Sequence, residues 1–356
     1  MGDYPSRSAD TNAGGPDVTG RHARAAGTGV SPRLPGVPPL GGGGALPTKA
    51  RFGVESGFRA VSTAAGAMVL VIIVAIAIFL ISKATPALRA DTQNFLTYER
   101  WFPNDTQPHF GIAALAFGTV LTSIIALIVA VPIALGIALF LSHYAPKRLA
   151  TPLGFIIDLL AAVPSVVFGL WGRDVFLNPV RDFSLWLNEY FGWIPIFGGD
   201  GPFGRSILLG SLVLAIMVLP IVTSLSREVF MQTPGMNEEA ALALGATKWE
   251  MVRTAVLPYG RPGVIAAVML GLGRALGETI ALALTLGTVF NISFNIIQNG
   301  GNSIAANIAN TFGEANATGR GALIASGLVL FAITLVVNMA ARAIIYRRRE
   351  FRDSAA

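Results

Sequence analysis

The sequence predicts an all-α polytopic membrane protein, and three observations indicate this fold class. Hydrophobic residues make up 53% of the chain and charged residues only 13%. Several apolar runs are about 20 residues long, which is enough for a helix to cross a hydrocarbon layer roughly 30 Å thick. Lys and Arg residues collect between these runs, mainly on one side. This composition overrides the two or three soluble domains that a length of 356 residues would suggest.

Charge and composition exclude several other functions. The net charge is +6, but the basic residues flank apolar spans and do not form one stripe, so a nucleic-acid surface is not indicated. There is no Cys and the three His residues are scattered, so the sequence offers no disulfide and no metal-ligand spacing. The first apolar run lacks a small-residue cleavage site, and we expect it to stay as a membrane anchor.

Residues 1–58 are rich in Gly, Pro, Ser and Arg and contain too little apolar surface to fold alone. We predict a disordered cytosolic tail there, a solvated leader whose Arg residues could also touch anionic lipid. A transmembrane permease domain is expected over 59–346, followed by a cytosolic C-terminal tail at 347–356.

Apolar runs within 59–346 predict the membrane spans. The second and fifth are longer than a bilayer needs, which implies tilt or extension beyond the lipid. The six predicted spans are Val61–Ile81, Ile112–Ser142, Pro152–Trp171, Ser206–Ser226, Gly263–Phe290 and Ala322–Ile345.

The distribution of Lys and Arg orients these spans. Of the 26 basic residues, 18 lie in the N-terminal tail, the 143–150 loop, the 227–262 loop and the C-terminal end, whereas 7 lie in the opposite loops. Because the side with more Lys and Arg faces the cytoplasm, both termini and the 227–262 loop are predicted to be cytoplasmic. On the other side, the Asn-rich segment 291–321 could present amides to a docking partner, line a mouth, or be an ordinary polar loop.

The cytoplasmic 227–262 loop predicts two short capped helices. Asn237 can cap the first, and Gly245 can end it in a left-handed conformation. Thr247 followed by Glu250 is a capping box that starts the second helix, and Pro258 is expected to end it. Small side chains make this hairpin a compact knob that another protein could approach closely.

The fifth span contains two charged residues, Arg274 and Glu278. Their spacing predicts one helix face, which would also carry Thr285 and Thr288 together with Gly271 and Ala281. Arg274 would lie roughly 16 Å into the bilayer at 1.5 Å per residue. The face could be an oxyanion path in which Glu278 neutralises an unoccupied Arg274. Alternatively, the two residues could form a structural ion pair.

Three motifs show a resemblance to a known family. They are Gly273–Thr279 (GRALGET), Val163–Gly172 (VPSVVFGLWG) and Ile304–Asn310 (IAANIAN). Together with the spacing of the 227–262 loop, they resemble the PstC-type permease subunits of phosphate ABC importers, a group of the binding-protein-dependent transport permeases. The resemblance covers about 60–345 and implies a six-helix type I permease fold with a cytosolic coupling hairpin.

The resemblance also assigns roles to residues. It implies that Arg274 and Glu278 are needed for transport, and it indicates the ATPase-coupling positions. Ala255 stands where the family usually has Ile, which puts the apolar packing of the hairpin in doubt. The implied coupling residues are Glu239, Ala240, Ala241, Gly245, Leu257 and Pro258.

The expected function is therefore that of a non-enzymatic permease subunit for inorganic phosphate in the bacterial inner membrane. The chain has no phosphate-loop motif, so ATP and Mg²⁺ are expected on a separate ATPase and no cofactor on this chain. The implied partners are a PstA-like permease, two PstB-like ATPases and an external PstS-like binding protein. A permease for sulfate or molybdate and a non-transporting scaffold or sensor subunit remain alternatives.

Overall fold

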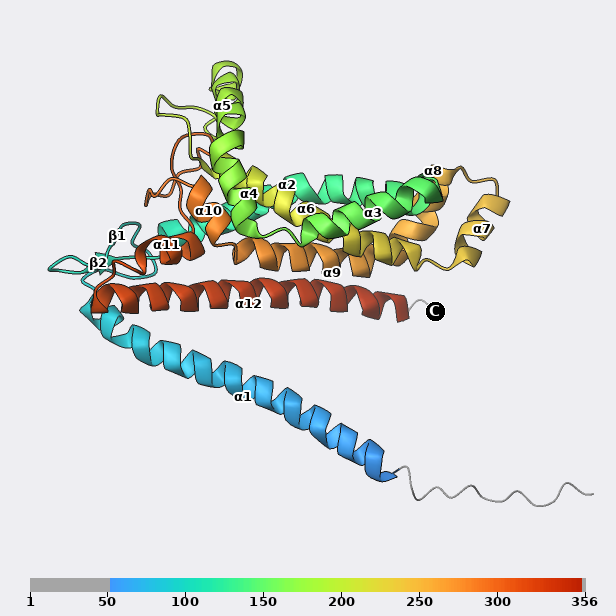
Figure 1. Cartoon of the computed structure of the whole chain (residues 1–356), viewed down its shortest axis with the longest axis horizontal. Helices are drawn as coiled ribbons and strands as arrows, with labels where there is room; N and C mark the ends of the chain where they lie inside the picture. The colour runs from blue at the N-terminus through green and yellow to red at the C-terminus, as the bar shows by residue number, and fades with distance from the viewer. Residues whose placement is uncertain (1–51, 354–356) are drawn as a thin grey trace, which may run out of the picture. The chain divides into compact units, whose positions relative to one another are not determined.

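The computed structural model describes residues 52–353, and it consists of helices with one small hairpin, in agreement with the predicted fold class (Figure 1). Residue contacts divide the chain into 1–64 and 65–356, so the first residues of α1 belong to a separate unit. The elements are α1 Phe52–Ala90, β1 Trp101–Phe102, β2 His109–Phe110, α2 Ala113–Leu139, α3 Lys147–Ala161, α4 Ser165–Trp171, α5 Leu177–Phe191, α6 Ile207–Met231, α7 Gly235–Ala243, α8 Lys248–Met251, α9 Leu257–Leu276, α10 Ile280–Thr285, α11 Ile304–Thr311 and α12 Ala317–Asp353.

Three π-helical turns extend helices, and two of them join neighbouring helices without a loop. They are η1 Phe140–Tyr144 after α2, η2 Gly172–Phe176 between α4 and α5, and η3 Val252–Val256 between α8 and α9. Such turns are widened single turns that occur inside longer helices. Within residues 52–353, five helices are long and apolar enough to cross a membrane, and one further pair is bent.

Helix α6 forms the centre of the bundle. It packs on α2, α3 and α9, and α9 in turn lies beside α12. The contact between α2 and α6 is close because α2 presents Ala126, Ala130 and Ala134 at four-residue intervals, and all three are fully buried. Small side chains at this spacing let helices approach closely in a membrane, where packing rather than the hydrophobic effect favours association.

The third predicted span, Pro152–Trp171, is wrong as a continuous helix. The chain bends by 89° between α3 and the helix that begins at Ser165. Pro164 causes the break, since it lacks an N–H group and has an extended ψ of 138°. The segment after the break, α4, packs against α10 and α6.

Two glycines permit the close packing of α4. A Cβ atom on Gly169 would lie 2.9 Å from the Cα of Ala281, and one on Gly172 would lie 2.6 Å from Val213. Both distances are shorter than ordinary van der Waals contact, so only glycine fits there. The VPSVVFGLWG motif therefore combines a proline that breaks the span with glycines that seat the following helix.

Both described ends of the chain are helical. Helix α1 begins at Phe52, so 52–58 are helical and not disordered. The predicted tail at 347–356 is helical as far as Asp353, because α12 continues to that residue. Residues 1–51 and 354–356 of the two predicted tails lie outside the described residues.

At the end of the bundle predicted to be external, the β1–β2 hairpin packs on the beginnings of α2 and α12. Trp101, Phe110 and Leu115 are buried there together with Ile304 and Leu323. The segment 286–303 is extended, and it bonds to the loop before α6 through Asn299 and Gly300, whose N–H groups donate to Pro202 and Arg205. This network holds α11 on the bundle.

Replacement of Gly169 by Ala should destabilise the protein, because the new Cβ overlaps the α10 backbone. Overpacking of this kind costs about 1–3 kcal/mol. Gly136→Ala is the matched control, since a Cβ at Gly136 meets nothing within 4 Å. Thermal unfolding of the purified protein should show a lower midpoint for Gly169→Ala only. Equal midpoints for the two variants would contradict the close packing of α4 on α10.

Candidate functional site

Arg274 lies near the end of α9, where the fifth predicted span departs from a helix. The span was expected to continue to Phe290, but α9 ends at Leu276 and Gly277 follows as its C-cap. A second short helix, α10, begins at Ile280. Glycine is a poor helix former, and its position here agrees with the end of the helix. The prediction that Arg274 and Glu278 share one helix face is therefore wrong.

Glu278 instead binds the start of α10. Its side chain is only 7% exposed, and its Oε1 atom accepts a hydrogen bond of 3.3 Å from the backbone N–H of Ala281. This satisfies one of the free N–H groups at the start of a helix and places the carboxylate at the positive end of the helix dipole. Glu278 thus has a partner other than the expected Arg274.

Arg274 is half-buried and carries its charge without a carboxylate partner. Among the side chains that the structure describes, the ion pairs involve His109, His143, Arg173 and Arg181, and none involves Arg274. The Nε atom of Arg274 is buried and has no hydrogen-bond partner. A guanidinium group can donate several hydrogen bonds to an anion, so Arg274 is a candidate anion-binding group.

The other two predicted path residues are separated from Arg274. Thr285 is buried at the end of α10, and its hydroxyl group donates to the carbonyl of Ala281. Thr288 is exposed in the extended segment that follows. The structure therefore does not bring Thr285 and Thr288 onto one stripe with Arg274.

Arg274 lines a pocket between helices α6, α9 and α12, which we call the α9–α12 pocket. Its volume is about 690 Å³, and its lining is mostly apolar apart from two arginines and an amide. The lining residues are Ile221, Ala266, Met269, Leu270, Gly273, Arg274, Asn338 and Arg342. A low-polarity lining strengthens the attraction between a guanidinium group and an anion.

The hairpin of α7 and α8 is the second candidate site. Gly245 has a φ of +87°, and the capping box of Thr247 and Glu250 is present, so both predictions are confirmed. Asn237 is not the cap, because α7 begins at Gly235 after Pro234. Pro258 does not end the second helix. Since η3 precedes it and a proline near a helix start needs no N–H partner, the helix continues into α9.

The hairpin forms a groove of about 520 Å³ at the surface. Three predicted coupling residues, Ala240, Ala241 and Pro258, line it, whereas Glu239, Gly245 and Leu257 do not. Ala255 also lines the groove, so the missing Ile leaves space at the surface. Leu244, which also lines the groove, is 90% exposed, and Met236 on α7 is 80% exposed. Exposed apolar side chains around a groove are typical of a protein-docking surface.

The hairpin is fixed to the bundle by apolar packing and by one polar side-chain contact. Phe230 at the end of α6 is fully buried among Met251, Val252 and Val256. His143, at the end of α2, lies 3.4 Å from the carboxylate of Glu238 on α7 and is largely buried. These contacts link the position of the hairpin to the ends of two long helices.

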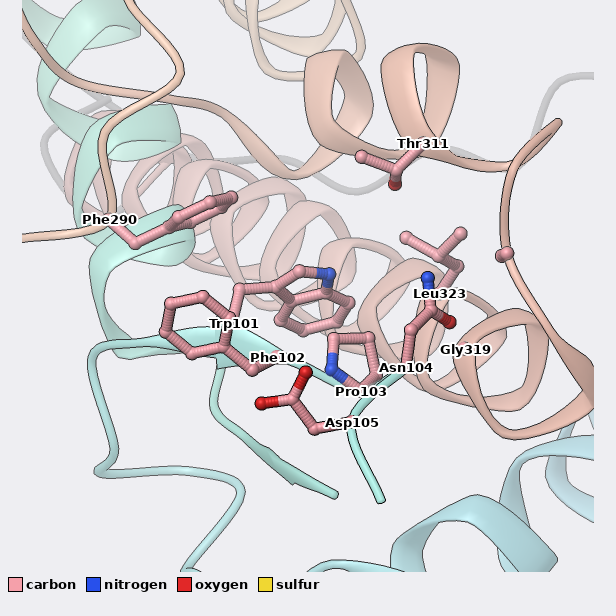
Figure 2. A pocket seen from close by; sticks show the side chains of 10 residues that line it. Trp101, Phe102, Pro103, Asn104, Asp105, Phe290, Thr311, Gly319 and Leu323 are labelled. Atoms are coloured by element: carbon pink, nitrogen blue, oxygen red, sulfur yellow. The ribbon is translucent and has the colours of Figure 1, made fainter. Parts of the chain in front are cut away.

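A smaller pocket of about 180 Å³ lies by the β1–β2 hairpin. Figure 2 shows Asp105 and Thr311 on opposite sides of it. Its surface is mainly aromatic and aliphatic, and its one charged lining residue is the acidic Asp105. Such a pocket does not attract an anion.

Sequence reasoning missed His143, Asn338 and Arg342. The two α12 residues are one helical turn apart at the end of an apolar span, and this spacing was an available signal. Their approach to Arg274 was not predictable from local pattern, since it depends on how α9 and α12 pack.

The sequence is similar to those of known membrane transport proteins. Residues 130–350 match the family described as binding-protein-dependent transport system inner membrane component. The chain is 48% identical over 292 residues to the phosphate transport system permease protein PstC 2 of Mycobacterium tuberculosis, covering 81% of this chain and 90% of that protein. It is 41% identical over 294 residues to the PstC protein of Xylella fastidiosa, covering 82% and 90%. A solved bacterial ABC transporter involved in alginate import is 16% identical, with a TM-score of 0.49, covering 81% of this chain and 96% of that one.

Loss of the contact between His143 and Glu238 should loosen α7. In His143→Ala we expect hydrogen exchange of the α7 amides to rise about two- to tenfold, since a side-chain hydrogen bond contributes about 0.5–1.5 kcal/mol. His109→Ala is the matched control, because His109 is 3.9 Å from Asp105 in the β1–β2 hairpin segment. Mass spectrometry of exchanged peptides measures the hydrogen exchange of both variants. Unchanged α7 exchange in His143→Ala would show that apolar packing alone holds the hairpin.

Proposed function

This chain belongs to the binding-protein-dependent transport system inner membrane component family, and we propose that it is a permease subunit of an ATP-driven importer of inorganic phosphate. The observation that carries this proposal is the identity of 48% over 292 residues with a phosphate transport system permease. Arg274 lies in a mostly apolar pocket of the spanning helices and forms no ion pair with a described side chain, which supports an anionic substrate.

Arg274 has the chemistry that phosphate recognition requires. Its guanidinium group offers a planar set of donors that matches phosphate oxygens in pairs, and it stays charged at every physiological pH. Transport also needs the anion to leave, so a single site should attract phosphate only weakly. Glu278 lies two residues beyond the end of α9 and binds the start of α10, and we expect its carboxyl group to limit how tightly an anion is retained.

Energy should reach this site through the α7–α8 hairpin. We infer that a separate ATPase, with ATP and Mg²⁺, docks on the hairpin groove and its exposed Leu244. Because His143 and Phe230 join the hairpin to the ends of α2 and α6, its movement would shift those helices as rigid bodies. The Arg274 region would then open alternately to the two sides of the membrane.

The assembly that fits this proposal contains several different subunits. A PstA-like second permease would complete the pore, two PstB-like ATPases would bind the two hairpins, and a PstS-like protein would deliver phosphate from outside. The hairpin and both termini would face the cytoplasm, in line with the excess of Lys and Arg on that side.

Arg274→Gln tests the anion-binding role. ATP-dependent uptake of labelled phosphate into vesicles that contain the assembled importer should fall at least about tenfold, since hydrogen bonds to charged groups contribute about 1.5–3 kcal/mol. Arg173→Gln, which removes an exposed arginine paired with Asp174, should leave uptake unchanged. If Arg274→Gln prevents assembly, the residue is structural and the proposed role is wrong.

Gly245→Asp tests energy coupling through the hairpin. A side chain at the φ of +87° is strained and costs about 1–2 kcal/mol, so the turn should shift. Uptake per ATP hydrolysed should fall several-fold while the permease stays folded. Gly235→Asp adds the same charge at the start of α7, where a Cβ also meets nothing within 4 Å. An equal loss in both variants would indicate an effect of charge and not of the turn.

A further inference from the structure

Two arginines from distant parts of the sequence meet at the α9–α12 pocket. Arg274 comes from the last turn of α9 and Arg342 from α12. Asn338 lies one helical turn before Arg342, so both side chains project from one face of α12. The pocket thus gathers two guanidinium groups and an amide, whereas its remaining lining residues are apolar or glycine.

Neither arginine is neutralised by a described side chain. The ion pairs among the described side chains leave out Arg274 and Arg342 alike, and the Nε atom of Arg274 is buried without a partner. Two like charges at one weakly polar pocket repel each other, and the buried Nε atom of Arg274 adds a desolvation cost, whereas Arg342 is exposed. An anion in the pocket would remove both penalties.

We propose that Arg342 and Asn338 join Arg274 in a binding site for a phosphoryl oxyanion, which is either free phosphate or the headgroup of an anionic phospholipid. Guanidinium groups bind such oxygens in pairs, and the amide supplies a further donor. The volume of about 690 Å³ accommodates either group. For free phosphate, the inference rests on the proposed function and adds α12 to the substrate path.

Gly273 keeps this pocket open next to Arg274. A Cβ atom at Gly273 would meet nothing within 4 Å, and the residue lines the pocket. A larger side chain could therefore enter the pocket without displacing protein atoms, and it would favour the α9 helix relative to glycine. Gly273→Leu fills the site while leaving all its charges in place, so it provides a test that is independent of Arg342.

The experiment measures binding of radiolabelled phosphate to the assembled permease and ATPase complex, without the external binding protein. The complex is placed in nanodiscs of phosphatidylcholine, with or without phosphatidylglycerol, and retained lipid is detected by native mass spectrometry. Arg342→Gln and Gly273→Leu should weaken binding of phosphate, or retention of phosphatidylglycerol, by about tenfold or more. Arg320→Gln is the control on the same helix, since Arg320 lies over the ring of Phe312 and outside the pocket.

Free phosphate and a phospholipid headgroup would give different results in this experiment. Free phosphate is the ligand if phosphate binds in phosphatidylcholine alone and depends on Arg342. A lipid headgroup is the ligand if phosphatidylglycerol is retained through Arg342 and phosphate does not displace it. If wild-type complex takes up no phosphate and yet one of these bindings depends on Arg342, the proposed function fails while the site stands.

Two outcomes would contradict the proposed oxyanion site. The first is that Arg342→Gln and Gly273→Leu bind phosphate and retain phosphatidylglycerol like the wild type. The second is that Arg342→Gln separates the subunits while Arg320→Gln and Gly273→Leu keep the complex intact. In that case Arg342 binds a carboxylate of a partner subunit and not an oxyanion.

Discussion

A permanent positive charge within apolar helices is the constraint on which the candidate site depends. An arginine side chain that faces lipid is costly, so the helices around Arg274 must offer a pocket, a partner or an aqueous path. The structure offers a pocket shared with Arg342. No carboxylate of a described residue forms an ion pair with Arg274. In our proposal, the guanidinium group of Arg274 is what connects this fold to anion transport.

The break between α9 and α10 separates the two charged residues, and neighbouring elements stabilise it. Glu278 binds the N–H of Ala281 at the start of α10, and Gly169 of α4 allows the α4 backbone to approach the same residue. The helix that follows the break in the third predicted span, α4, therefore packs against the helix that follows the break in the fifth, α10. Substrate-binding regions of transporters are commonly built from such interrupted helices, because free helix ends provide polar groups within the membrane.

Sequence reasoning located most elements but not the breaks within them. Apolar runs predicted the spans, and local turn chemistry predicted Gly245 and the Thr247–Glu250 capping box, because both depend on neighbouring residues. The break after Leu276 was missed since apolar residues continue on both sides, although Gly277 was a signal. Arg342 was missed because its approach to Arg274 depends on the packing of α12 on α9, which no local pattern encodes.

A double-mutant cycle on phosphate uptake tests the central claim, that Arg274 acts as a free cation and not as the partner of Glu278. ATP-dependent uptake is measured for wild type, Arg274→Gln, Glu278→Gln and the double variant, all in the assembled importer. We expect the double variant to be as defective as Arg274→Gln. The amide oxygen introduced by Glu278→Gln can still accept the hydrogen bond from Ala281, but the substitution does not restore a cation at position 274. Recovery of uptake in the double variant would contradict it, because only a neutralised ion pair would behave in that way.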